Sequence, residues 1–266
     1  MRFTIAEKLA FAATGGQGFD TARPVVVFLH GAGMFHVVWA LQARHLAHHG
    51  CSVLALDLPG HGDSEGPAMD NIAAMAGWVT EMLRKLNVVQ AILVGHSMGA
   101  LIALEVASQN PTLIQAIALL GAAATMPVHP DLLTAAKTNP AKAVALIVEW
   151  GHGSRGHMGG APTPGLWLAG GAARILHAAR PGVLATDLSA CAAYRHGAEA
   201  AAMITCPVHV ICGAADKMTP PKAGIALSQI LQKGSVEVLP EVGHMMMTED
   251  PVATTAAIKR GIHDEE

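Results

Sequence analysis

The chain has 266 residues, of which 52% are hydrophobic and 14% charged, and its formal net charge is −3. A chain this apolar and this long folds into one or two domains with a large core, which excludes intrinsic disorder over most of its length. Nucleic-acid binding is also excluded, because the charge is nearly balanced and aromatic residues make up only 4%.

Short apolar runs alternate along the chain with longer helical patterns. Six runs are predicted strands: 25–29, 53–56, 91–94, 117–120, 208–211 and 235–239. Five stretches are predicted helices: 35–49, 70–86, 98–109, 222–231 and 252–262. Apolar runs without polar alternation are typical of strands buried on both faces, so the pattern predicts an α/β fold with a mostly parallel sheet. Residues 3–13, with two glycines after them, are predicted to form an antiparallel hairpin at the sheet edge.

One region interrupts this alternation. Residues 122–203 contain Ala-rich helical stretches but no strand-like run, and residues 151–171 are rich in glycine. Long irregular segments inside a compact domain are often functional lids. We therefore predict a core domain of residues 1–121 and 204–266, with residues 122–203 inserted as a helical cap.

Cysteine spacing and the chain start bear on cofactors and location. The four cysteines form no C-x-x-C pair, so neither a zinc site nor a dithiol site is expected. Glu7 and Lys8 lie where a signal peptide needs apolar residues, and the longest apolar run, 116–128, is too short to span a bilayer. We expect a cytoplasmic monomer or homodimer that uses no metal or cofactor and binds neither membrane nor nucleic acid.

The strongest local signal is the sequence GHSMG at residues 95–99. It follows the predicted strand 91–94 and opens the predicted helix 98–109, which is the context of a G-x-S-x-G nucleophile elbow. Such a turn exposes Ser97 at the carboxyl end of the sheet and at the positive end of a helix. The alternative is a simple N-cap serine, but a cap requires no glycine on both sides.

A serine nucleophile needs a base, and the base needs an acid. His244 follows the last predicted strand, so its loop opens at the same edge of the sheet as Ser97. Asp216 follows the strand 208–211, one strand away. Alternatively, His244 is a packed turn residue and Asp216 forms an Asx turn. The chain order Ser97, Asp216, His244 is the one expected of a catalytic triad in this architecture.

The loop after strand 25–29 is the candidate second half of an oxyanion hole. The N–H of Met98 is the first expected donor, and the N–H of Ala32, or else of Gly33, is the second. His30 is expected to order this loop by hydrogen bonding.

Four residues are candidates for contact with substrate, two of them within the predicted cap. They are His30, His96, Trp150 and Trp167.

Taken together, these segments make the chain resemble the α/β-hydrolase superfamily, in its lid-bearing, esterase-like branch. The resemblance rests on HGAG at 30–33, DLPGHGDS at 57–64, the elbow, GAAD at 213–216 and GH at 243–244. It implies a sheet of about eight strands, a cap inserted after the sixth strand and a Ser-Asp-His triad. Within residues 57–64, Asp57 and Asp63 are interpreted as turn-forming residues.

The sequence therefore predicts a serine hydrolase that cleaves a small-to-medium apolar ester or lactone through an acyl-enzyme. Carbon–carbon hydrolysis of dienoic diketones, enol-lactone hydrolysis and thioester hydrolysis remain alternatives, because they use the same triad. A ligand-binding sensor on the same scaffold is the alternative outside enzymes. Fold alone does not decide among them.

Overall fold

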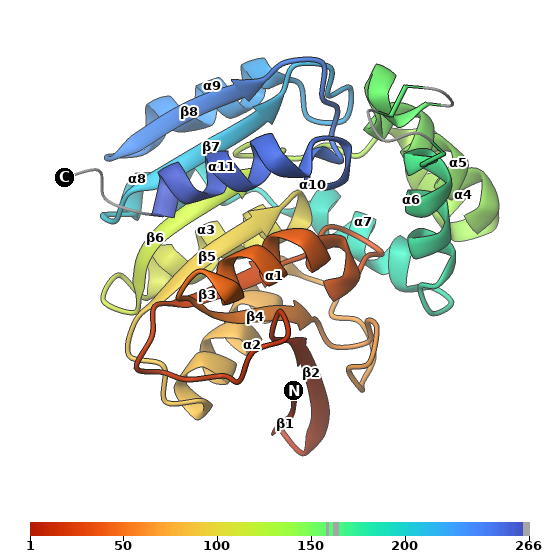
Figure 1. Cartoon of the computed structure of the whole chain (residues 1–266). Coiled ribbons are helices and arrows are strands. Elements are labelled where there is room, and N and C mark those ends of the chain that lie inside the picture. Colours follow the sequence, from red (N-terminus) through yellow and green to blue (C-terminus); the bar gives the residue numbers. More distant parts are fainter. Residues whose placement is uncertain (158–159, 162–164, 263–266) are drawn as a thin grey trace.

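The computed structural model describes residues 1–157, 160–161 and 165–262, which form an eight-stranded sheet flanked by helices (Figure 1). The sheet order is β1-β2-β4-β3-β5-β6-β7-β8. The strands are β1 (Arg2–Ile5), β2 (Lys8–Ala13), β3 (Val25–Leu29), β4 (Ser52–Asp57), β5 (Ala91–His96), β6 (Ile114–Leu120), β7 (Val208–Gly213) and β8 (Gly234–Leu239). Strands β3 to β8 pair in parallel, whereas β1 and β2 are antiparallel. The predicted α/β fold is confirmed.

The central strands are apolar on both faces because helices cover both faces. In β3 every residue is buried. Val25, Val27 and Leu29 pack in one core, while Val26 and Phe28 pack in the other. Because successive side chains of a strand point to opposite faces, this burial explains the unbroken apolar runs.

The helices form two layers. In Figure 1, α1 and α11 lie on the near face of the sheet, and α2, α3, α8 and α9 lie on the far face. The helical segments are η1 (His36–Trp39), α1 (Ala40–His48), α2 (Ile72–Lys85), α3 (Met98–Gln109), α4 (Pro130–Thr138), α5 (Pro140–Gly151), η2 (Ser154–Gly156), α6 (Leu168–His177), α7 (Val183–Ala193), α8 (Gly197–Met203), α9 (Pro221–Ile230), α10 (Met246–Glu249) and α11 (Pro251–Ile262).

Two predicted helices differ from the structure by more than one residue at their N-terminal ends. The stretch 35–49 divides into the 3-10 turn η1 and the helix α1. Helix α2 begins at Ile72 rather than residue 70, because the Asn71 side chain caps it by accepting a hydrogen bond from the N–H of Ala74 at 2.7 Å.

The predicted edge hairpin is confirmed, with its turn at Ala6 and Glu7. Both residues have positive φ, of 45° and 64°, as a two-residue turn between twisted antiparallel strands requires. Gly15 and Gly16 follow β2, outside the hairpin turn.

Helices α4 to α7 lie beyond the carboxyl ends of the strands, at the right of Figure 1. Helix α8 is different, because it packs against α3 and α9 in the far helix layer although it falls within the predicted cap. Residues 158–159 and 162–164 of the predicted glycine-rich stretch lie outside the described residues. Among the helices described, none has the length and apolarity needed to cross a membrane.

Candidate active site

Ser97 lies on a strained turn between β5 and α3. Its φ of 53° and ψ of −115° are unusual for a residue with a side chain. A Cβ on Gly95 would lie 2.3 Å from the carbonyl oxygen of Gly99, and a Cβ on Gly99 would lie 2.2 Å from that of Leu29. Both glycines are therefore needed for the turn to form. The Ser97 side chain makes no capping hydrogen bond, which argues against the simple N-cap interpretation.

His244 and Asp216 are paired in the interior. Nδ1 of His244 lies 2.7 Å from Oδ2 of Asp216, and the two residues are 2% and 4% exposed. Oδ1 of Asp216 accepts hydrogen bonds from the N–H groups of Met218 and Thr219, both at 2.8 Å. The Asx-turn interpretation is thus correct as well, and the turn orients the carboxylate toward the ring. Since Nδ1–H donates to Asp216, Nε2 of His244 is left as the basic nitrogen.

Ser97 and His244 line the same cavity, which has a volume of about 610 Å³. Within the described part of the chain, no hydrogen bond joins their side chains; such bonds often tighten only when substrate is bound. The wall is shared between the core, with Ala32, Ser97, Lys217, Met218, Thr219 and His244, and the inserted segment, with Met126, Pro127, Val128, His129, Pro130, Leu132, Trp150, Leu188 and Cys191.

Of the two oxyanion donors predicted in the loop of residues 30–34, one has a free N–H within the described residues and the other does not. Ala32 lines the cavity, and the N–H groups of Ala32 and Met98 donate to no described residue. The N–H of Gly33 instead donates to Oδ2 of Asp187 at 2.7 Å. Gly33 is therefore not free to bind an oxyanion, and its prediction as a donor is wrong.

The two predicted pocket histidines do not reach the cavity. His30 is fully buried, Nδ1 donates to the carbonyl of Gly31 at 2.9 Å, and Nε2 accepts from the N–H of Leu58 at 3.3 Å. Burial and the nearby ring of His61 lower the pKa of His30 to about 4, so it is neutral. His30 orders the loop of residues 30–34 by hydrogen bonding, as expected, but it does not line the cavity that contains Ser97.

His96 is also fully buried, and its Nε2 lies 3.0 Å from the carbonyl of His244. Burial, followed by the adjacent His244 ring, holds the pKa of His96 well below its ordinary value. The neutral His96 ring therefore donates from Nε2 to the carbonyl of His244 and helps to hold the His244 backbone in place.

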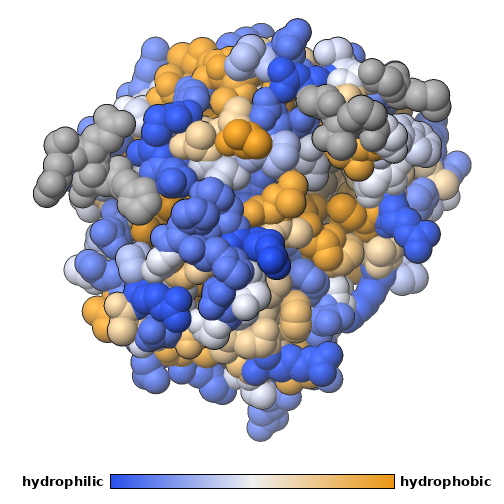
Figure 2. All heavy atoms as spheres, in the orientation of Figure 1, coloured by the Kyte–Doolittle hydropathy of each residue, from blue (hydrophilic) through white to orange (hydrophobic). Residues whose placement is uncertain are grey.

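Of the two predicted pocket tryptophans, only one lines the cavity. Trp150 lines the cavity, whereas Trp167 is 58% exposed and lies outside it. Figure 2 shows hydrophobic residues gathering right of centre, where the core meets the α4–α7 helices. The sequence does not distinguish Trp150 from Trp167, because both fall in the inserted segment.

Asp57 has the structural role that the sequence predicts. Its carboxylate accepts hydrogen bonds from the N–H of His36 at 2.7 Å and the N–H of Asp63 at 2.9 Å. Asp57 therefore holds two turns together and stays away from the cavity.

Sequence reasoning missed much of the cavity wall. The segment 126–130 leaves the carboxyl end of β6, so the topology itself places it beside Ser97. Met218 and Thr219 follow Asp216 directly on one loop. Leu132 and Leu188 carry no sequence signal, because an apolar residue on a helix is usually core.

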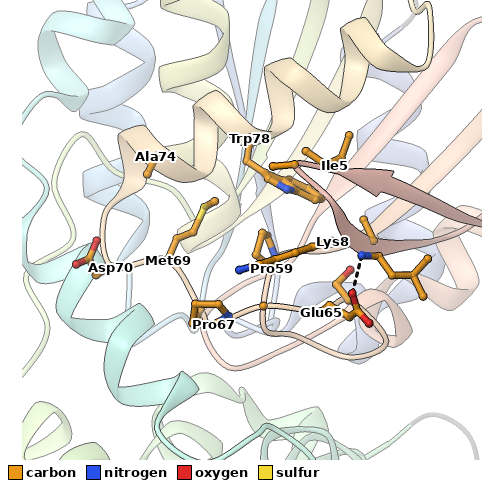
Figure 3. Close-up of a pocket in the computed structure, with 15 residues that line it drawn as sticks. Ile5, Lys8, Pro59, Glu65, Pro67, Met69, Asp70, Ala74 and Trp78 are labelled. Carbon is orange, nitrogen blue, oxygen red and sulfur yellow. Dashed lines mark hydrogen bonds between the residues drawn. The ribbon is translucent and has the colours of Figure 1, made fainter.

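A second cavity, of about 470 Å³, lies between the edge hairpin, the loop after β4 and α2. Figure 3 shows Met69 and Trp78 beside it, with Glu65 near the hairpin. The Glu65 carboxylate accepts a hydrogen bond from the N–H of Leu9 at 2.8 Å. Since none of the predicted catalytic residues lines this cavity, the candidate site is the one that contains Ser97.

Known proteins resemble this chain in both sequence and structure. A model of the alpha/beta hydrolase family matches residues 26–258. A solved thermophilic esterase is 26% identical, with a TM-score of 0.80, covering 98% of this chain and 95% of that chain. The enol-lactonase of Burkholderia xenovorans LB400 is 22% identical, with a TM-score of 0.84 and coverage of 97% and 98%, which shows likeness of fold.

Among curated relatives, the (E)-2-((N-methylformamido)methylene)succinate hydrolase of Acinetobacter baylyi is 36% identical over 96 residues, which is 36% of each chain. The chain spans between 29% and 42% of the length of the first curated relatives it matches.

Proposed function

Because this chain belongs to the alpha/beta hydrolase family, we propose that it is a serine hydrolase that cleaves a small-to-medium apolar carboxylic ester or lactone through an acyl-enzyme intermediate. The observation that carries the proposal is the buried His244–Asp216 pair at 2.7 Å, whose His244 lines the same cavity as Ser97. A strained serine turn beside a buried histidine–carboxylate pair is the arrangement that nucleophilic acyl transfer requires.

The reaction begins with Nε2 of His244 taking the proton from Ser97 Oγ as Oγ bonds to the substrate carbonyl carbon. The negative charge moves to the carbonyl oxygen, where the N–H groups of Met98 and Ala32 stabilise it. The C–O bond to the alcohol then breaks, and His244 returns its proton to the leaving oxygen. Asp216 stabilises the imidazolium that exists between these two transfers.

The second half repeats these transfers with water in place of serine. His244 takes a proton from water, the hydroxide bonds to the acyl carbon, and the bond to Oγ breaks as Ser97 recovers its proton. The acid then leaves, and in a lactone both products are one molecule.

The cavity wall favours an apolar acyl group. Most of the side chains that line it are apolar, and among the described lining residues none is a carboxylate. The exposed Lys217 is at the wall, on the loop that carries Asp216. Apolar walls with few polar groups are typical of small-molecule sites and suit aliphatic or aromatic esters.

The test is hydrolysis of p-nitrophenyl esters and of a lactone panel by wild type, Ser97→Ala and Ser108→Ala. Ser108 is the matched control because it lies on the same helix but donates to the carbonyl of Glu105 and does not line the cavity that contains Ser97. We expect Ser97→Ala to lose at least about 10³-fold in kcat, and Ser108→Ala to keep its activity. Undiminished hydrolysis by pure Ser97→Ala would rule the proposal out.

The sensor alternative is decided by covalent labelling. A fluorophosphonate reacts with an activated serine, so the enzyme should label rapidly in wild type and Ser108→Ala but not in Ser97→Ala. A folded wild-type protein that takes up no label would favour a binding protein instead.

A further inference from the structure

One buried carboxylate of the inserted helices reaches into the core beside the candidate site. We propose that Asp187 is a positioning residue that fixes the loop of residues 30–34, so that the N–H of Ala32 is held ready for the oxyanion. The inference rests on the proposed function, since it assigns a role within the same reaction.

The contacts of Asp187 join three distant segments of the chain. It lies on α7 and is 0% exposed. Oδ2 accepts the N–H of Gly33 at 2.7 Å and lies 2.8 Å from Nε2 of His61. Gly33 follows β3, His61 follows β4, and α7 belongs to the inserted segment, so this one oxygen ties the three together.

His61 supplies the charge that a buried carboxylate needs. Its Nδ1 lies 3.0 Å from the carbonyl oxygen of Pro59, and its Nε2 faces Asp187. Both neighbours are acceptors, so a ring protonated on both nitrogens satisfies both. Burial opposes this charge, but the hydrogen bond and negative charge of Asp187 outweigh it, with smaller help from Asp57, and they raise the pKa of His61. The protonated His61 ring is thus a charged donor to Asp187, and charge-assisted hydrogen bonds of this kind are shorter and stronger than neutral ones.

The peptide bonds on both sides of Ala32 are held in place. His30 donates to the carbonyl of Gly31, which fixes the peptide plane whose N–H belongs to Ala32. Asp187 accepts from Gly33, which fixes the next plane. Because both peptides are trans, the Ala32 N–H points opposite to the Gly31 carbonyl, and the Ala32 carbonyl points opposite to the Gly33 N–H.

Packing against α7 restricts the conformation of the loop of residues 30–34. Gly33 has a φ of +68°, and a Cβ there would lie 2.8 Å from Cδ1 of Leu184, one turn before Asp187 on α7. The loop is thus pressed against the helix whose carboxylate it binds. Donors that are fixed before the reaction are what stabilises a developing oxyanion, because no reorganisation is then required.

The experiment compares Asp187→Leu, which removes the acceptor, with Asp187→Asn, which keeps an acceptor oxygen but no charge. Tyr194→Phe is the matched control, since it removes another hydrogen bond between the end of α7 and the core, from Tyr194 to Glu105 at 2.7 Å, away from the loop. The readouts are kcat and KM for a p-nitrophenyl ester and the affinity for a trifluoromethyl ketone, whose serine adduct carries an oxyanion.

For Asp187→Leu we expect kcat to fall about 10- to 100-fold with KM within a few-fold, and ketone affinity to fall in parallel. Asp187→Asn should lose about 3- to 10-fold in the same two readouts, because a neutral acceptor binds the N–H less strongly. Tyr194→Phe should match wild type in kcat.

The inference is overturned if folded Asp187→Leu keeps a kcat within two-fold of Tyr194→Phe, or if it changes KM alone. If Asp187→Leu does not fold, Asp187→Asn decides, and a kcat and ketone affinity equal to those of Tyr194→Phe overturn it. Ser97→Ala is assayed alongside. If Ser97→Ala remains active, the proposed function has failed, whereas an inactive Ser97→Ala beside a wild-type-like Asp187→Leu refutes only the role of Asp187.

Discussion

Gly121 offers a way to displace His244, the proposed base, without altering any residue of the proposed triad. It follows β6 with a φ of +56°, and a Cβ there would lie 2.8 Å from both Cε1 and Nδ1 of His244 and 3.5 Å from Oδ2 of Asp216. Ordinary van der Waals contact begins near 3.4 Å. In Gly121→Ala the ring must therefore move by about 0.6 Å, against its hydrogen bond to Asp216.

The magnitude follows from this displacement. A misplacement of about 1 Å can cost about 10²-fold in rate, so a shift of about half that size should lower kcat about 10-fold. A positive φ also costs a residue with a side chain about 1–2 kcal/mol. We therefore expect Gly121→Ala to lose both activity and stability.

Gly50→Ala separates these two effects. Gly50 has a φ of +95° and nothing within 4 Å of its Cβ position, so its alanine suffers backbone strain without displacing a neighbour. Ester hydrolysis and urea unfolding are measured for both variants. Both should lose stability, and only Gly121→Ala should lose kcat. If the two variants have the same kcat, the contact with His244 does not control the position of the base.

Two further predictions concern acid stability and chain-length preference. The pKa of His30 is lowered from 6.5 to about 4 in the folded chain. Between these two pH values His30 binds a proton in the unfolded chain but not in the folded chain, so the free energy of unfolding falls as the pH drops from 6.5 to 4. The contribution of His30 to this loss of stability is about 3 kcal/mol. In urea unfolding at pH 7 and pH 4, His30→Gln should therefore lose less stability between the two pH values than wild type. Equal losses in the two proteins would contradict the lowered pKa of His30. Trp150→Ala should enlarge the cavity and raise kcat/KM for long acyl chains relative to short ones about 10-fold. The exposed Trp167→Ala is its control, and an unchanged chain-length profile in Trp150→Ala would exclude Trp150 from acyl binding.

The sequence predicts the parts of this molecule whose signals are local. The unbroken apolar run at 25–29 predicts a strand buried on both faces, because only a covered sheet shields such a run from water. The GHSMG motif predicts a turn because the sterics of Gly95 and Gly99 act within a few residues and between neighbouring strands. Burial on both faces of the sheet and close approach of the backbone each restrict the residue types that a position can hold.

The parts that escape prediction depend on long-range contacts. Nothing near Gly33 indicates that its N–H is taken by Asp187, which is 154 positions away. Likewise His30 and His96 follow or end strands at the active edge, yet they lie in the interior as neutral rings. Whether a histidine faces a cavity or packs behind it depends on which helices cover it, and the Ala-rich inserted segment carries few signals of its packing.

The core and the inserted segment both line the cavity that contains Ser97, and this has an evolutionary consequence. We assign bond cleavage to loops of the sheet, while much of the cavity wall comes from α4, α5 and the segment before them. Replacements there can broaden or narrow the range of accepted molecules while the machinery that breaks the bond is inherited unchanged. Helix α7 does not share this freedom, because the loop at Gly33 depends on its carboxylate. Diversification should therefore proceed unevenly, with α4 and α5 varying rapidly and α7 varying little.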